Sequence, residues 1–194
     1  MVRQTSASVI RAAFVAAVVL ASLVSVSASA TTMMKLDLAG LTQRADTVVA
    51  GHVNDSQAAW TSDHSAIYTD VTIVVERSLA GSFTAGQTVT VRSEGGTIDG
   101  VGMRVYGAAG FAKNEEVVVF LEQRAGHRYV VGMAQGKLLV TTDASGVKRL
   151  HRNLADVSFL PQSATSTPAG PSLQSISTID ELATAVQRLR THAH

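Results

Sequence analysis

The pattern of apolar and polar residues predicts an all-β domain between residues 36 and 150. Thr88–Arg92 alternates, so that Val89 and Val91 share one face of a half-buried strand. Val117–Leu121 is a continuous apolar run rich in β-branched residues, which is typical of a strand covered on both faces. Glycines separate these apolar segments and allow tight turns between them. We therefore expect a small Greek-key or OB-like barrel of about seven short strands.

Further strands are predicted by the same criteria at Thr47–Asn54, Ile67–Leu79, Met103–Tyr106, Arg128–Val131, Lys137–Thr142 and Val147–Leu150. The residues Asn54-Asp55-Ser56 indicate a turn after the first of these strands. The polar stretch 57–66 that follows predicts a loop anchored by one aromatic side chain, Trp60.

Two helices are expected to flank the β domain. Leu36–Ala45 places Leu38, Leu41 and Ala45 at helical spacing, and Asp37 is expected to be the N-cap. Thr178 and Glu181 form a capping box in front of a second helix. The apolar residues of that C-terminal helix recur at steps of four and three, and this face could pack back onto the sheet, which is the commoner outcome, or bind a partner.

The first thirty residues read as an export signal. Arg3 and Arg11 supply the positive end, Ala12–Val26 is small and apolar, and Ala28-Ser29-Ala30 offers a cleavage site. The apolar run is too short for a permanent membrane span. We therefore predict a periplasmic or extracellular protein with no membrane attachment after signal cleavage.

Proline, serine and threonine cluster after the β domain and indicate a linker. The predicted organisation is a signal peptide at 1–30, a barrel domain at 31–160, a linker at 161–176, and a C-terminal helix and tail at 177–194.

Composition and charge narrow the chemistry. Loss of Arg3 and Arg11 lowers the basic count from 16 to 14 against 15 acidic residues, so the net charge changes from +1 to −1. No basic patch with interleaved aromatics is present, and nucleic acid is not an expected partner. The chain has no cysteine, which excludes thiol catalysis, iron–sulfur clusters and cysteine zinc sites. No cofactor is predicted.

A glycine-rich segment runs from Gly95 to Gly102 and has four glycines in eight residues. It could be a ligand-binding loop, or a wide hairpin or kinked connection, which we favour. The third glycine of the dinucleotide fingerprint is missing, and no phosphate-binding Gly-Lys-Ser/Thr sequence occurs.

Several of these segments together resemble an uncharacterised family of small exported bacterial proteins. The resemblance rests on Ala45-Asp46 before an apolar strand, Leu79-Ala80-Gly81, the glycine loop, Glu115–Leu121 and Val131–Lys137. It implies an architecture and an exported location, but no catalytic residues. A weaker likeness to the netrin-like, OB-barrel fold of tissue metalloproteinase inhibitors rests on the first two motifs and the late Glu-Glu-x-x-x-Phe-Leu strand. Inhibitors of that type chelate zinc through an N-terminal cysteine, which this chain lacks.

Histidines and carboxylates give little reason to expect catalysis or metal binding. His52, Asp55, Asp63 and His64 lie near one another in sequence, but a solvated surface is the favoured interpretation. No Gly-x-Ser-x-Gly motif occurs.

The favoured function is a non-enzymatic binding or interaction module that contacts a protein partner through the glycine-rich region. Long ordered loops on rigid β scaffolds often carry binding. The candidate contact residues are Gly95, Gly96, Ile98, Asp99, Gly100, Gly102, Arg104, Tyr106, Gln135 and Lys137. An unrecognised hydrolase or metal-dependent enzyme, with His52, His64 or Asp99 converging on a cleft, is one alternative. A periplasmic protease inhibitor is another.

Overall fold

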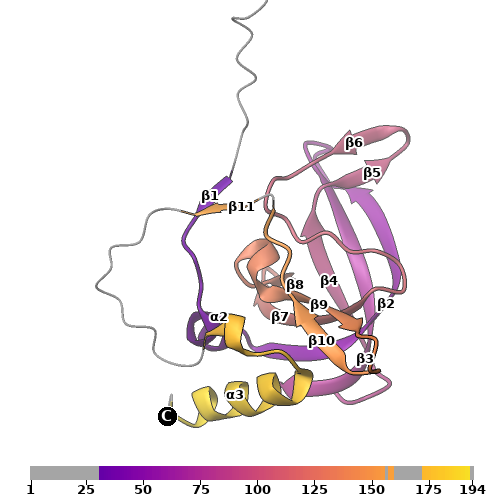
Figure 1. Ribbon diagram of the computed structural model, residues 1–194. Coiled ribbons are helices and arrows are strands. Elements are labelled where there is room, and N and C mark those ends of the chain that lie inside the picture. Colours follow the sequence, from indigo (N-terminus) through magenta and orange to yellow (C-terminus); the bar gives the residue numbers. More distant parts are fainter. Residues whose placement is uncertain (1–30, 156, 160–171, 193–194) are drawn as a thin grey trace, which may run out of the picture.

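The computed structural model describes residues 31–155, 157–159 and 172–192 (Figure 1). The predicted export signal and residues 161–171 of the predicted linker lie outside this part of the chain. The strands are β1 (Thr31–Met33), β2 (Thr47–Trp60), β3 (Ile67–Ala80), β4 (Thr88–Glu94), β5 (Gly96–Ile98), β6 (Val101–Met103), β7 (Glu116–Arg124), β8 (His127–Val130), β9 (Lys137–Thr142), β10 (Lys148–His151) and β11 (Val157–Phe159). The helices are α2 (Leu38–Arg44), α3 (Ile179–Thr191) and the short 3₁₀ turns η1 (Met133–Gly136) and η2 (Leu173–Ser175).

Antiparallel pairing builds the main sheet and confirms the all-β class. Within the described residues, seven strands pair in the order β10-β9-β7-β2-β3-β4, with β8 also on β7. One edge of β7 is shared, because Val117–Val119 pair with β9 whereas Leu121–Arg124 pair with β8. A small β5–β6 hairpin and a parallel β1–β11 pair lie beside this sheet.

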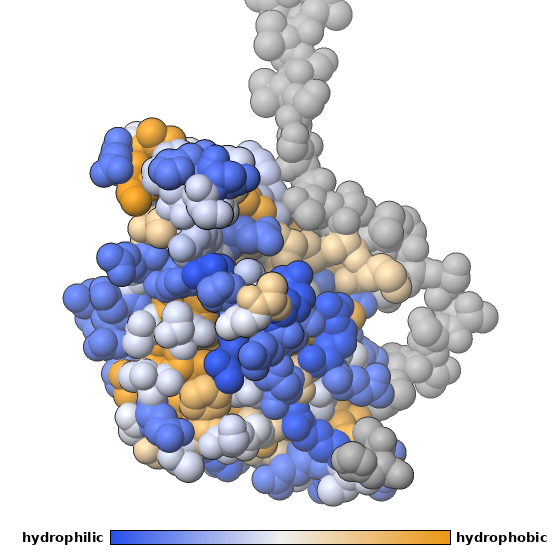
Figure 2. All heavy atoms as spheres, turned by 180° about the vertical axis from the view of Figure 1, so that it is seen from behind, coloured by the Kyte–Doolittle hydropathy of each residue, from blue (hydrophilic) through white to orange (hydrophobic). Residues whose placement is uncertain are grey.

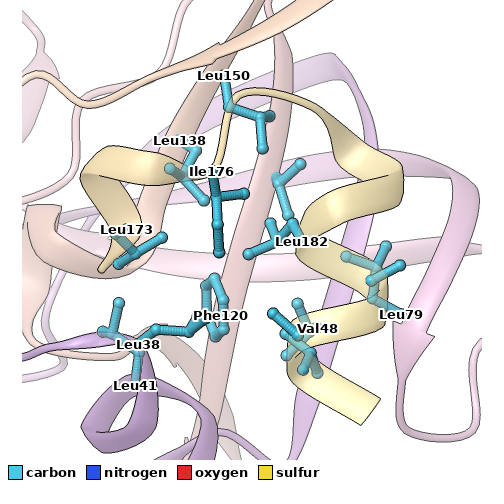
Figure 3. Close-up of a cluster of buried hydrophobic side chains, with 14 of the residues drawn as sticks. Leu38, Leu41, Val48, Leu79, Phe120, Leu138, Leu150, Leu173, Ile176 and Leu182 are labelled. Carbon is cyan, nitrogen blue, oxygen red and sulfur yellow. The ribbon is translucent and has the colours of Figure 1, made fainter. Parts of the chain in front are cut away.

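Buried apolar side chains cover both faces of β7, as its continuous apolar run predicts. Val117, Val119 and Leu121 face an inner cluster shared with β2, β3, β4 and β8. Val118 and Phe120 point to the other face, into a cluster with residues of α2 and α3 (Figure 3). The inner cluster fills the concave side of the sheet, and the outer cluster fixes the helices on the convex side.

Both predicted helix caps are confirmed. The Asp37 carboxylate accepts a hydrogen bond from the Gly40 N–H at 2.7 Å, and the Thr178 hydroxyl accepts one from the Glu181 N–H at 3.3 Å. The Glu181 side chain accepts from the Ser177 N–H at 2.7 Å. Leu182 in α3 is fully buried against the sheet (Figure 3), so the helix packs in cis as predicted. None of the helices in the described ranges is long and apolar enough to cross a membrane.

The predicted turn at Asn54–Ser56 is wrong, and the predicted loop at 57–66 begins too early. β2 continues to Trp60, which pairs with Ile67 of β3. Its register shifts between Val53 and Asp55, so a bulge absorbs the polar residues without ending the strand. The predicted strand at Met103–Tyr106 is displaced as well, because Val101–Met103 is the segment that pairs with β5.

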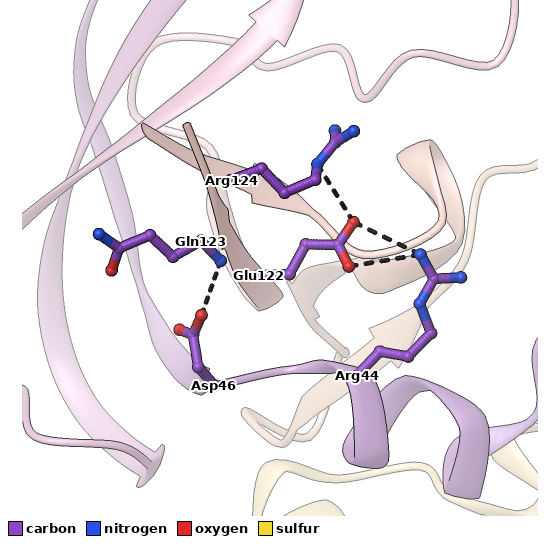
Figure 4. Close-up of polar contacts among 5 residues, drawn as sticks. All are labelled: Arg44, Asp46, Glu122, Gln123 and Arg124. Carbon is purple, nitrogen blue, oxygen red and sulfur yellow. Dashed lines mark hydrogen bonds and ion pairs between the residues drawn. The ribbon is translucent and has the colours of Figure 1, made fainter. Parts of the chain in front are cut away.

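A polar cluster fastens the α2–β2 corner to the end of β7 (Figure 4). The Asp46 carboxylate accepts from the Gln123 N–H at 2.6 Å, while the Asp46 N–H donates to the Leu121 carbonyl at 2.9 Å. The Glu122 carboxylate is paired with Arg44 at 3.3 Å and Arg124 at 3.5 Å. These contacts orient the chain as it enters β2.

The sheet curls until its strands β4 and β8 lie close to each other. Within the described residues, no ladder of backbone hydrogen bonds joins these two strands, and we call the gap between them the seam. Residues 105–110 cross this seam. The Ser93 hydroxyl of β4 donates to the Ala109 carbonyl at 2.7 Å, and the Ala134 N–H of η1 donates to the Gly107 carbonyl at 2.9 Å. The predicted barrel is therefore a curled sheet joined at its open seam by a loop.

Candidate binding cleft

A cleft of about 750 Å³ lies between the β5–β6 hairpin, the loop that crosses the seam, and β9. Its walls come from segments that are distant in sequence. The lining residues are Thr69, Val71, Ser93, Glu94, Gly95, Gly96, Thr97, Gly102, Met103, Arg104, Val105, Gly107, Ala108, Ala109, Gly110, Phe111, Glu115, Ala134, Lys137, Leu139, Asn153 and Val157. Ligand sites on curled sheets commonly occupy such a mouth.

The β5–β6 hairpin forms one wall and projects from the body of the molecule (Figure 1). Ile98 and Val101 flank a two-residue turn, Asp99-Gly100, whose φ angles are 51° and 78°. Asp-Gly tolerates two successive positive φ angles, so it is a preferred sequence for such turns. The hairpin interpretation of the glycine-rich segment is thus correct, although the turn is tight rather than wide.

Glycines let the root of the hairpin lie directly on β3. Gly96 has φ of 146°, and a Cβ atom there would come within 2.4 Å of the Thr69 hydroxyl. That hydroxyl donates to the Gly95 carbonyl at 2.7 Å. A larger residue at position 96 would push the hairpin away from the sheet and change the shape of the cleft.

An ion pair stabilises the wall opposite the hairpin. Lys137 Nζ lies 2.6 Å from Glu115 Oε2, and the two side chains are 13% and 18% exposed. The same ammonium group donates to the Gly110 carbonyl and lies 4.6 Å from the centre of the Phe111 ring. Lys137 therefore fixes the chain between Gly110 and Glu115 in place.

The structure divides the candidate contact residues into those that line the cleft and those that do not. Gly95, Gly96, Gly102, Arg104 and Lys137 line it. The other candidates lie elsewhere: Ile98, Asp99 and Gly100 at the end of the hairpin, Tyr106 on the surface, and Gln135 in the interior.

Gln135 is a structural residue, since its side chain is only 1% exposed. Its carbonyl oxygen accepts from the Leu36 N–H at 2.7 Å, and its amide donates to the Met34 carbonyl at 3.0 Å. Arg152 donates to the Gln135 backbone carbonyl at 2.9 Å, and burial lowers the pKa of this arginine. Gln135 thus ties the segment before α2 to η1.

Sequence reasoning missed lining residues that come from outside the glycine-rich region. Thr69 and Ser93 lie on the sheet strands β3 and β4, whereas Asn153 and Val157 come from the far end of the domain. The sequence did place Thr69 on a predicted strand, Ile67–Leu79. That it lines the same cleft as Asn153 depends on the tertiary fold, which no local pattern reveals.

The structure does not bring His52 and His64 together. His52 Nδ1 lies 2.9 Å from Glu76 Oε1 on the neighbouring strand, whereas His64 stacks on Trp60 in the β2–β3 turn. Asp99 is at the end of the β5–β6 hairpin. Among the described residues, no three histidine, aspartate or glutamate side chains are grouped so that they could hold a metal ion.

Asp63 has a local role in the β2–β3 turn. Its carboxylate accepts hydrogen bonds from the hydroxyls of Thr61 and Ser65 at 2.6 and 2.8 Å. These bonds favour the charged form and lower the pKa of Asp63 to about 2.

The surface near the cleft is mixed in polarity. Figure 2 shows polar and apolar areas interspersed over the back of the molecule, with a small hydrophobic area over the β5–β6 hairpin. Val101 is 49% exposed, and Tyr106, 42% exposed, has the Arg104 guanidinium 5.1 Å from the centre of its ring.

Comparisons with known proteins add no assignment. No family model, no curated protein and no solved structure matches the chain. The resemblance to small exported bacterial proteins therefore stays a prediction from the residues.

Proposed function

We propose that this chain is an exported, non-enzymatic binding module whose binding site is the cleft beneath the β5–β6 hairpin. The observation that carries the proposal is the cleft itself, about 750 Å³ in volume, with walls from the hairpin, the seam loop and β9. Its size suits a specific ligand, and its lining combines apolar surface with a few polar groups.

Four polar side chains of the cleft bond to other groups of the protein, which supports binding rather than turnover. Lys137 and Glu115 pair with each other, and the Thr69 and Ser93 hydroxyls donate to backbone carbonyls. A general acid or base must reach the proton it transfers. These groups are instead used to hold the walls in position.

Export is part of the proposal and rests on the first thirty residues. We expect the protein to leave the cytoplasm and to lose its signal after Ala30. N-terminal sequencing of the exported protein would then begin at Thr31. Retention of the full chain in the cytoplasm would contradict this.

Filling the cleft tests its role. Gly110 lines the cleft, and a Cβ atom there would meet no described atom within 4 Å apart from its chain neighbours, so Gly110→Trp adds a large ring at the wall of the cleft without a clash at the backbone. The matched control is Ala144→Trp, an exposed position in the β9–β10 turn. We expect Gly110→Trp, but not the control, to lose ligands that the wild-type protein retains from an extract of its own organism, as measured by mass spectrometry. Equal retention by both variants would contradict the proposal.

A second pair of substitutions tests the hairpin side of the site. Ile98→Ala and Tyr106→Ala remove apolar surface at and beyond the hairpin. If a protein partner contacts this region, we expect weaker capture by the double variant while its thermal unfolding is unchanged. Unchanged capture would confine the binding site to the interior of the cleft.

A further inference from the structure

The edge of β6 that faces away from β5 carries backbone hydrogen-bonding groups, and β6 contributes Gly102 to the lining of the cleft. Ile98 and Val101 flank the two-residue turn, so they form the hydrogen-bonded pair that such a turn requires. Pairs alternate along an antiparallel ladder, so the next pair, Thr97 and Gly102, is not hydrogen bonded. The N–H and carbonyl of Gly102 therefore point away from β5.

Gly102 is also a lining residue of the cleft. Within the described part of the chain, β6 pairs only with β5. Its outer edge can therefore accept a further strand, and unpaired strand edges are templates for strand addition.

Small residues leave room for a backbone to approach this edge. Gly95, Gly96, Gly107 and Gly110 line the cleft together with Ala108, Ala109 and Ala134. At Gly102 itself, an added Cβ would meet only the Thr97 hydroxyl among the described atoms within 4 Å, at 3.6 Å. An extended chain can lie against such walls more closely than against large side chains.

The charges of the cleft balance. Its charged lining residues are two acids, Glu94 and Glu115, and two bases, Arg104 and Lys137. Lys137 and Glu115 neutralise each other at 2.6 Å. Because the charges of its lining residues cancel, the cleft does not attract a ligand of either net charge, and an uncharged ligand suits it best.

From these observations we propose that the cleft binds an extended peptide segment of a partner protein, uncharged where it enters, which adds as a strand to the outer edge of β6 at Gly102. This inference rests on the proposed function and specifies its ligand. Main-chain hydrogen bonds to Gly102 supply affinity, and the small walls select short side chains.

The test is a selection of random short peptides on the chain that lacks only its predicted export signal. We expect extended, uncharged peptides that Gly110→Trp no longer binds. N-methylation removes a backbone donor, so a methyl group on the peptide residue that pairs with Gly102 should weaken binding by about tenfold, the effect of one good hydrogen bond, whereas the two neighbouring positions should tolerate it.

A matched pair of variants tests the same contact from the protein side. Gly102→Pro removes the backbone donor, whereas Gly102→Ala keeps it. We expect the dissociation constant of a selected peptide to rise about tenfold for the proline variant relative to the alanine variant. Should Gly102→Pro fail to fold, by circular dichroism, the methylated peptides on the wild-type protein decide the question.

The remaining outcomes separate the two proposals. Peptides insensitive to methylation, or equal affinity in the two Gly102 variants, overturn strand addition. If no peptide is selected but Gly110→Trp loses a ligand of another class, the binding function stands and the peptide ligand is wrong. If Gly110→Trp binds the selected peptides as wild type does, the peptides bind outside the cleft and strand addition at Gly102 is overturned, whereas the binding function is then decided by the ligands retained from the extract.

Discussion

At the scale of single residues, close backbone approaches set the strongest constraints. Gly51 lies where β2 shifts its register against β3. A Cβ atom there would lie 2.0 Å from the Val74 carbonyl oxygen and 3.2 Å from Ile73 Cγ2. The backbones of β2 and β3 cannot move apart at this point without breaking the hydrogen bonds between the two strands. Close packing therefore requires glycine at position 51.

We predict that Gly51→Ala lowers the free energy of unfolding by about 2 kcal/mol or more, because a strand must move to admit the methyl group. Urea denaturation measures the change. Gly110→Ala is the control, since the space around it is open, and we expect it to stay within about 0.5 kcal/mol of wild type. Similar losses in both variants would contradict the close approach at Gly51.

Asp63 allows a prediction about pH. Its hydrogen bonds lower the pKa from 3.8 to about 2, so they stabilise the β2–β3 turn above the unfolded pKa. That contribution is lost as the pH falls through the folded pKa. We expect the Asp63 carboxyl resonance to titrate near pH 2 in NMR spectra. In Thr61→Ala, which removes the largest contribution, the midpoint should move back towards 3.8; an unchanged midpoint would contradict the assignment.

At the scale of secondary-structure elements, local chemistry predicted helix starts better than strand ends. Asp37 and Thr178 cap helices because side-chain oxygens satisfy free N–H groups nearby, a contact that sequence alone can reveal. The second half of β2 is polar and reads as a loop. It is a strand because β3 runs alongside it as far as the Trp60–Ile67 pair, and tertiary pairing overrides local polarity.

The cap of α3 can be tested directly. We expect Thr178→Ala to lower the free energy of unfolding by about 1 kcal/mol, because the Glu181 N–H loses its acceptor. Thr184→Ala is the matched control on the exposed face of the same helix, where the hydroxyl bonds back to the Asp180 carbonyl at 3.0 Å. Alanine is a better helix former, so the control should cost nothing in thermal unfolding. Equal destabilisation of the two variants would argue against the cap.

At the scale of the whole molecule, the helices and the sheet share one core on the convex face. Leu182 is fully buried in the cluster that contains Phe120 and Leu38 (Figure 3). The apolar stripe of α3 predicted its buried face. The cleft was less accessible to sequence reasoning, because its walls bring Thr69, Gly110 and Asn153 together only after folding.

We predict that Leu182→Ala lowers the free energy of unfolding by about 2–5 kcal/mol, because it opens a cavity between α3 and the sheet. Gln187→Ala, on the exposed face of the same helix, should change it by less than about 0.5 kcal/mol. Denaturant unfolding followed by far-ultraviolet circular dichroism distinguishes them. A small effect at Leu182 would mean that α3 detaches in solution.

The loop at 105–110 lines the cleft and also joins β4 to η1 through its backbone carbonyls, which accept hydrogen bonds from both elements. A ligand bound there would contact the loop that joins β4 to η1, so tighter binding would raise the free energy of unfolding. By mass action, a ligand at a hundredfold excess over its dissociation constant adds about 2.7 kcal/mol to the free energy of unfolding. If the cleft binds a ligand as we propose, the melting temperature will report its occupancy, and candidate ligands can be ranked with no activity assay.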